Sequence, residues 1–122
     1  MSVMSFLLAI GLVVLGTVGV RAGEATVEAV QVVETGDGVY RFDVTVRHED
    51  TGWDHYANAF TVSAEDGTLL GTRVLHHPHV NEQPFTRSLT GVAIPPGTTR
   101  VVVRAADNVH GEGPDYPVEL PR

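Results

Sequence analysis

A strict alternation of apolar and polar side chains between Val39 and His48 is the feature that most constrains the fold. The apolar side of this segment consists of Tyr40, Phe42, Val44 and Val46, and His48 follows on the same side. Residues two apart share a face in an extended chain, and here the residues between them are charged or carry a hydroxyl. The segment is therefore predicted to be a β-strand with one face in a core and the other in solvent.

Further segments are β-branched or repeat the period of two, and turn residues separate them. Asp66-Gly67 lies between two such segments and predicts a tight hairpin. Ile94-Pro95-Pro96-Gly97 must be a turn, because two consecutive residues lack an amide donor. The predicted strands are 26–34, 39–48, 56–64, 69–75, 85–92, 99–106 and 116–120. In the third of these, the predicted inward face is Tyr56, Asn58, Phe60 and Val62.

Seven short strands without any helical period predict one all-β domain, a seven-stranded antiparallel β-sandwich. The segments 94–97, 101–107 and 118–120, with Gly111 and Gly113, resemble the last three strands of bacterial immunoglobulin-like and fibronectin type III-like modules. This resemblance implies a fold and no particular activity. The stretches GWDHYANAF and HHPHVNEQPFTRSL also resemble small exported bacterial proteins of unknown function, which again implies no activity.

An uncharged apolar run occupies residues 6–20. It is shorter than the roughly 20 apolar residues of a membrane span, and it has the length of a signal-peptide core. Ala22, two residues after Val20, completes a cleavage pattern, so we predict a signal peptide of residues 1–22, a mature domain of residues 23–122, and a periplasmic or secreted location. Cleavage after Ala25 is the second choice. Residues 1–5 contain no Lys or Arg, so an uncleaved N-terminal anchor remains an alternative.

The charge of the predicted mature domain excludes several kinds of partner. Its seven arginines stand against fifteen acidic residues, a net charge of −8, and there is no lysine. Nucleic acids and anionic lipid surfaces both require a basic surface, so we expect neither as a partner. The absence of cysteine excludes disulfides and thiolate metal ligands, so a hydrophobic core must stabilise the domain.

The placement of the histidines is the main functional signal. If successive strands run up and down, the loops that follow strands 39–48, 69–75 and 99–106 meet at one end of the sandwich. We call this the histidine end, because all six histidines lie in or beside these three loops. They are His48, His55, His76, His77, His79 and His110.

We predict that the histidine end binds a divalent transition metal, with Cu(II) slightly ahead of Zn(II). Pro78 favours an extended His77, so that His77 and His79 can point at one centre while His76 faces away. Imidazole suits both metals, and the affinity should fall as the pH drops through about 6.5. The predicted ligands are His55, His77, His79 and His110. Supporting or binding positions are predicted at His48, Trp53, Asp54, His76, Glu82 and Asp107.

Two other roles for the histidine end remain open. In the first, its polar groups only brace the loops: His48 continues a buried face, and Asp107 can fold its own turn. In the second, the end contacts a protein partner through Trp53, Tyr56 and Phe85, because aromatic residues dominate such contacts.

Signatures of an enzyme are weak. Ser63 and Ser88 lie within predicted strands and lack the glycines of a nucleophile elbow. The sequence contains neither a phosphate-binding loop nor an HExxH motif. We therefore expect a binding or structural module rather than an enzyme.

Overall fold

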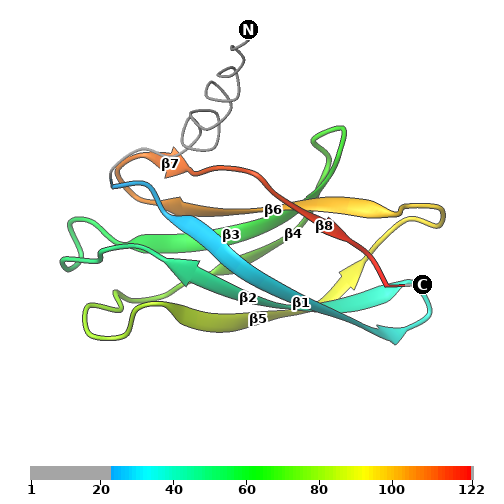
Figure 1. Ribbon diagram of the computed structural model, residues 1–122, viewed down its shortest axis with the longest axis horizontal. Coiled ribbons are helices and arrows are strands. Elements are labelled where there is room, and N and C mark those ends of the chain that lie inside the picture. The colour runs from blue at the N-terminus through cyan, green and yellow to red at the C-terminus, as the bar shows by residue number, and fades with distance from the viewer. Residues whose placement is uncertain (1–22, 122) are drawn as a thin grey trace, which may run out of the picture.

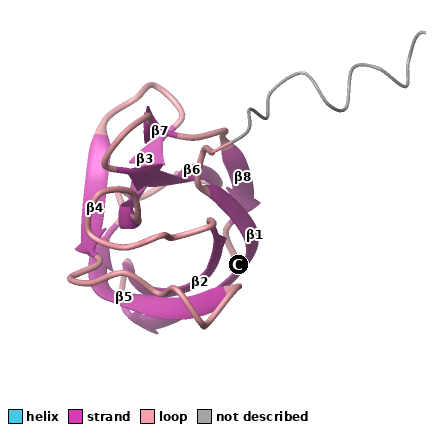
Figure 2. Cartoon of the chain, turned by 90° about the vertical axis from the view of Figure 1, so that its left-hand side faces the viewer, coloured by secondary structure: helices cyan, strands magenta, loops and turns pink. Residues whose placement is uncertain are grey.

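The computed structural model describes residues 23–121, and the predicted signal peptide lies outside these residues. Two antiparallel sheets enclose a common core, as Figures 1 and 2 show. The strands of the described part are β1 (Thr26–Gly36), β2 (Val39–Arg47), β3 (Ala57–Ala64), β4 (Leu69–Val74), β5 (Phe85–Ala93), β6 (Arg100–Asp107), β7 (Gly111–Glu112) and β8 (Tyr116–Glu119). Within residues 23–121 no helix is long and apolar enough to cross a membrane.

One sheet has the order β1-β2-β5, and the other has the order β4-β3-β6-β7, with β8 paired to β6. The predicted hairpin at Asp66-Gly67 is confirmed, since β3 and β4 pair antiparallel on either side of it. The expected count of seven strands is short by one, because residues of the predicted loop 107–115 form β7. Gly111 has a φ of +79°, and this turn brings Gly111 and Glu112 beside the end of β6.

The alternating face of β2 is buried as predicted, and its Phe42, Val44 and Val46 have no exposed surface. Strand β6 of the other sheet alternates in the same way, with Val101 and Val103 on its buried side. The two rows face each other across the core. Each row ends in a buried polar side chain, and these two polar residues begin the candidate site.

The predicted inward face of β3 is correct for Phe60 and Val62 and wrong for Tyr56 and Asn58. Ala57 faces the core instead, three positions before Phe60. The pairing with β6 shows why: Ala57 lies opposite Asp107 and Ala59 lies opposite Ala106, so Asn58 is an extra residue. Such a β-bulge makes the residues before it point to the opposite face of the sheet. Here it affects the start of β3, which lies at the histidine end.

The predicted meeting of three loops at the histidine end is confirmed. The β2–β3 and β4–β5 loops are joined by a hydrogen bond of 2.7 Å from the His79 N–H to Asp50 Oδ2. The β2–β3 and β6–β7 loops are joined by a hydrogen bond of 2.8 Å from the Tyr56 N–H to Asn108 Oδ1. Side chains from all three loops can therefore contribute to one site.

Candidate metal centre

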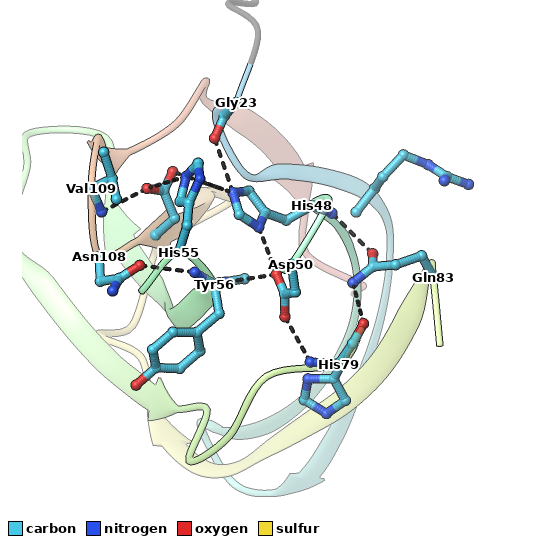
Figure 3. A network of polar contacts seen from close by, with 12 residues as sticks. Gly23, His48, Asp50, His55, Tyr56, His79, Gln83, Asn108 and Val109 are labelled. Atoms are coloured by element: carbon cyan, nitrogen blue, oxygen red, sulfur yellow. Dashed lines mark hydrogen bonds and ion pairs between the residues drawn. The ribbon is translucent and has the colours of Figure 1, made fainter. Parts of the chain in front are cut away.

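His48 lies at the centre of the site, with 2% of its surface exposed. Its Nδ1 lies 2.6 Å from Oδ1 of Asp50 (Figure 3). An ionised carboxylate only accepts hydrogen bonds, so Nδ1 of His48 carries the proton and donates it to Asp50. This bond fixes the ring and directs Nε2 toward the β2–β3 and β6–β7 loops.

Two imidazole nitrogens and both oxygens of one carboxylate gather at the histidine end. Nε2 of His48 lies 3.2 Å from Nε2 of His55 and 3.8 Å from Oδ2 of Asp107. Nε2 of His55 lies 3.3 Å from Oδ1 of Asp107. Ligands held at 2.0–2.1 Å around a tetrahedral zinc ion are about 3.4 Å apart. The two nitrogens and the Asp107 carboxylate thus have spacings that suit a single metal ion, since one ligand atom from each residue lies within 4.8 Å of the other two.

A tight turn positions His55. Its N–H donates to the Gly52 carbonyl at 3.2 Å, and its own carbonyl accepts from the Thr51 N–H at 3.0 Å. The ring of His55 lies edge-on to His48, with ring centroids 4.6 Å apart. Backbone geometry of the β2–β3 loop therefore presents this imidazole to the site.

Asp107 ends the buried row of β6, and its side chain is fully buried. Burial alone would raise the pKa of Asp107, but hydrogen bonds from the N–H groups of His110 and Val109 and from the His110 side chain lower it below its usual value. Those two N–H groups lie 2.7 and 2.8 Å from Oδ1. The expectation that Asp107 folds its own turn is thus confirmed, and the same contacts favour its ionised form.

His110 lies beside Asp107, with Nδ1 3.2 Å from Oδ1 of the carboxylate. Its ring centroid is 5.1 Å from that of His55. His110 is outside the group whose ligand atoms fit a single ion. Its position is that of a group that orients the Asp107 carboxylate.

His77 and His79 form a separate pair, with ring centroids 4.8 Å apart. The ring of His79 stacks on Phe85, and Nη2 of Arg87 lies 3.0 Å from its Nε2. Burial, followed by the positive charge of Arg87, lowers the pKa of His79 below its ordinary value. A guanidinium at the ring nitrogen opposes a second cation there, so this pair is a poor metal site.

The structure thus divides the four predicted ligands into two pairs, where the sequence predicted one centre. The ring of His110 is beside that of His55. His55 lies on one side of Asp50 and His79 lies on the other (Figure 3). The Asp50 carboxylate occupies the space between them, since it binds His48 with one oxygen and the His79 N–H with the other. Metal ligation by any of these residues remains a prediction.

The aromatic residues at the histidine end differ in exposure. Trp53 is 64% exposed and packs edge-on against the half-buried Tyr56. Phe85 is 1% exposed, so its predicted role as a surface anchor is wrong. The alternation of side chains along β5 directs Phe85 into the core, where its ring stacks on the ring of His79.

Three other predicted positions lie at the edge of the site. The exposed Asp54 contributes its backbone carbonyl, which accepts from the Asn108 amide at 3.2 Å. His76 is exposed, as expected from its facing away. Glu82 accepts a hydrogen bond of 3.1 Å from Arg87. Of these three residues, Asp54 is the one that contacts another loop of the site, and it does so through its backbone.

Sequence reasoning missed Asp50, whose buried carboxylate joins the loops. It accepts hydrogen bonds from His48 Nδ1, from the Ala57 N–H at 3.0 Å and from the His79 N–H. A signal existed, because Asp50 continues the even-numbered row that runs from Tyr40 to His48. Sequence reasoning also missed Gly23, whose carbonyl lies 2.9 Å from Nε2 of His48, and no local pattern marks this contact.

Comparison with known proteins adds one relative. A protein of Halomicrobium mukohataei named "Putative lipoprotein" is 44% identical over 90 residues, which cover 74% of this chain and 44% of that protein. The chain thus spans less than half the length of this relative. No family model matches the chain. No solved structure matches it either.

Proposed function

We propose that this chain is an exported β-sandwich domain that binds a divalent transition metal through His48, His55 and Asp107. The observation that carries the proposal is the convergence of two imidazole nitrogens and a carboxylate. The nitrogens are 3.2 Å apart, Oδ1 of Asp107 lies 3.3 Å from that of His55, and Oδ2 lies 3.8 Å from that of His48. The 3.2 Å between the two nitrogens is close to the edge of a tetrahedral shell, which places Zn(II) ahead of Cu(II).

The surroundings of the three ligands also support a metal site. Metal-bound histidines commonly donate their second ring N–H to a carboxylate, which fixes the tautomer. The bond from His48 to Asp50 has this form. The contacts of Asp107 with His110 and Val109 keep the third ligand ionised. The donor set is thus oriented before any ion arrives.

Two features support export to a periplasmic or secreted location. The apolar run of residues 6–20 has the length of a signal-peptide core. The relative from Halomicrobium mukohataei is named as a lipoprotein. A lipid attached through cysteine does not carry over to residues 1–122, because they contain no cysteine.

The immunoglobulin-like or fibronectin type III-like assignment is also part of the proposal. It is supported by the resemblance of residues 94–120 and by two antiparallel sheets with a three-stranded β1-β2-β5 layer.

A non-catalytic bracing role is the second candidate, and the contacts of Asn108 favour it. Its side chain accepts from the Tyr56 N–H and donates to the carbonyls of Trp53 and Asp54, which ties two loops without any metal. In this case, changes in the cluster would lower stability while metal affinity would be absent or nonspecific.

Calorimetric titration of the metal-free chain with Zn(II) and Cu(II), prepared without a polyhistidine tag, separates the two candidates. We expect His55→Ala to weaken Zn(II) binding at least tenfold, because one ligand is lost. His76→Ala is the matched control, since His76 is an exposed histidine outside the cluster, and its affinity should stay within about twofold. Equal affinities for the two variants would exclude the proposed centre.

A further inference from the structure

The carbonyl oxygen of Gly23 lies 2.9 Å from Nε2 of His48, the ring nitrogen that also faces His55 and Asp107 (Figure 3). We propose that this oxygen is a fourth ligand of the metal centre, so that the segment before β1 closes the site. This inference rests on the proposed function and specifies what kind of centre it is.

Nε2 of His48 has three polar neighbours: a carbonyl oxygen, a carboxylate oxygen and Nε2 of His55, which offers a lone pair when its ring carries the proton on Nδ1. Nδ1 of the same ring already donates to Asp50. Converging lone pairs require a proton or a cation between them. One proton satisfies a single contact, whereas a divalent ion can bind all of these atoms. The separation of 2.9 Å is near the roughly 3.0–3.4 Å between adjacent ligands in octahedral and tetrahedral shells.

Packing that does not involve the metal holds the segment of Gly23 in place. Ala25 is completely buried in the core. A Cβ on Gly113 would overlap the carbonyl oxygen of Ala25, so the absence of a side chain at Gly113 lets the two backbones cross. The carbonyl of Gly23, two residues earlier, is therefore positioned independently of any ligand.

Position 23 itself accommodates only glycine without distortion. Gly23 has a φ of +88°, in the region that L side chains rarely adopt. An added Cβ would lie 2.8 Å from Cε1 of His110. A side chain at this position must displace His110 or rotate the carbonyl away from His48.

The number of protein ligands decides what such a centre does. A zinc ion with three protein ligands keeps an open position for water or substrate, whereas four protein ligands make a closed structural site. Addition of the Gly23 carbonyl gives two imidazoles, one carboxylate and one carbonyl. The centre then stabilises the fold by fastening the N-terminal segment to the β2–β3 and β6–β7 loops, and hydrolytic chemistry is not expected.

Co(II) loading of the purified chain tests the fourth ligand, because its visible absorption reports coordination. We expect azide to leave the spectrum of the wild-type Co(II) form unchanged, since no position is open. In Gly23→Ala, we expect at least about tenfold weaker binding and a spectrum that changes with azide. Gly97→Ala is the matched control: Gly97 has a φ of +87°, and an added Cβ there meets no atom within 4 Å. It should carry the same backbone strain and bind like wild type.

The outcomes separate the fourth ligand from the proposed function. If His55→Ala weakens binding while Gly23→Ala behaves like Gly97→Ala, the metal centre stands and the Gly23 ligand is wrong. A change of the wild-type spectrum on azide addition also overturns the closed centre, without depending on the folding of any variant. If the wild-type chain binds no metal, both the proposed function and this inference fail.

Discussion

His48 and Asp107 each extend the buried row of a strand from a different sheet, and Nε2 of one lies 3.8 Å from Oδ2 of the other. Both side chains are nearly inaccessible, at the end of the core where apolar residues give way to polar ones. A site built from the ends of two facing strands is rigid, because its geometry is set by the packing of the sheets. The loops add His55 and Asp50 to this pair.

Removal of Asp50 should destabilise the fold. Asp50→Ala leaves three buried donors without an acceptor, from His48, Ala57 and His79. We expect a loss of about 3 kcal/mol or more in the free energy of unfolding, measured by urea denaturation. Asp54→Ala, which removes an exposed carboxylate from the same loop, should change it by less than about 0.5 kcal/mol. A loss in Asp50→Ala no larger than in Asp54→Ala would show that the three bonds contribute little.

Zn(II) should raise the unfolding temperature. An ion that binds only the folded state at 100 times its dissociation constant adds about 2.7 kcal/mol, which is a shift of about 10 °C or more for a domain of this size. In Asp107→Asn the shift should be much smaller, because the charged ligand is lost. Differential scanning calorimetry with Zn(II) and with excess chelator measures both, and an equal shift in the variant would place the ion elsewhere.

Stability should fall as the pH drops below about 6.5, through His79. Burial and Arg87 lower its pKa in the folded state, so the unfolded chain takes up this proton more readily. The free energy of unfolding therefore decreases as the pH falls from about 6.5, the pKa of His79 in the unfolded chain, to its lower pKa in the folded state. Below that pH His79 is protonated in both states, and the free energy no longer changes through this group. His79→Gln should reduce this dependence in denaturation experiments at pH 5 to 8, whereas His76→Gln should retain it. An unchanged pH profile in His79→Gln would assign the effect to other groups.

Trp53 and Phe85 should differ sharply in their contribution to stability. Trp53→Ala removes an exposed ring, and we expect the free energy of unfolding to change by less than about 0.5 kcal/mol. Phe85→Ala leaves a cavity in the core and should cost about 3–5 kcal/mol. Chemical denaturation checks both, and a large loss for Trp53→Ala would mean that its edge-on contact with Tyr56 contributes more to stability than its exposure implies.

The period of two and the turn residues between segments were enough to predict seven of the eight strands, the hairpin and the end of the sandwich at which the histidines gather. The period of two also predicted that His48 lies on a buried face, and the same parity applies to Asp50. Alternation is a local property of an extended chain, so it survives whatever the neighbouring strands do.

Only the tertiary structure decided which polar atoms meet. The bulge at Asn58 reverses the facing of β3 beside the site, and Asp50 separates His79 from His55. The approach of Gly23 to His48 depends on a backbone crossing at Gly113, far along the chain. These arrangements arise from register, twist and packing between segments distant in sequence, and distances of a few ångströms between such segments leave no trace in local periodicity.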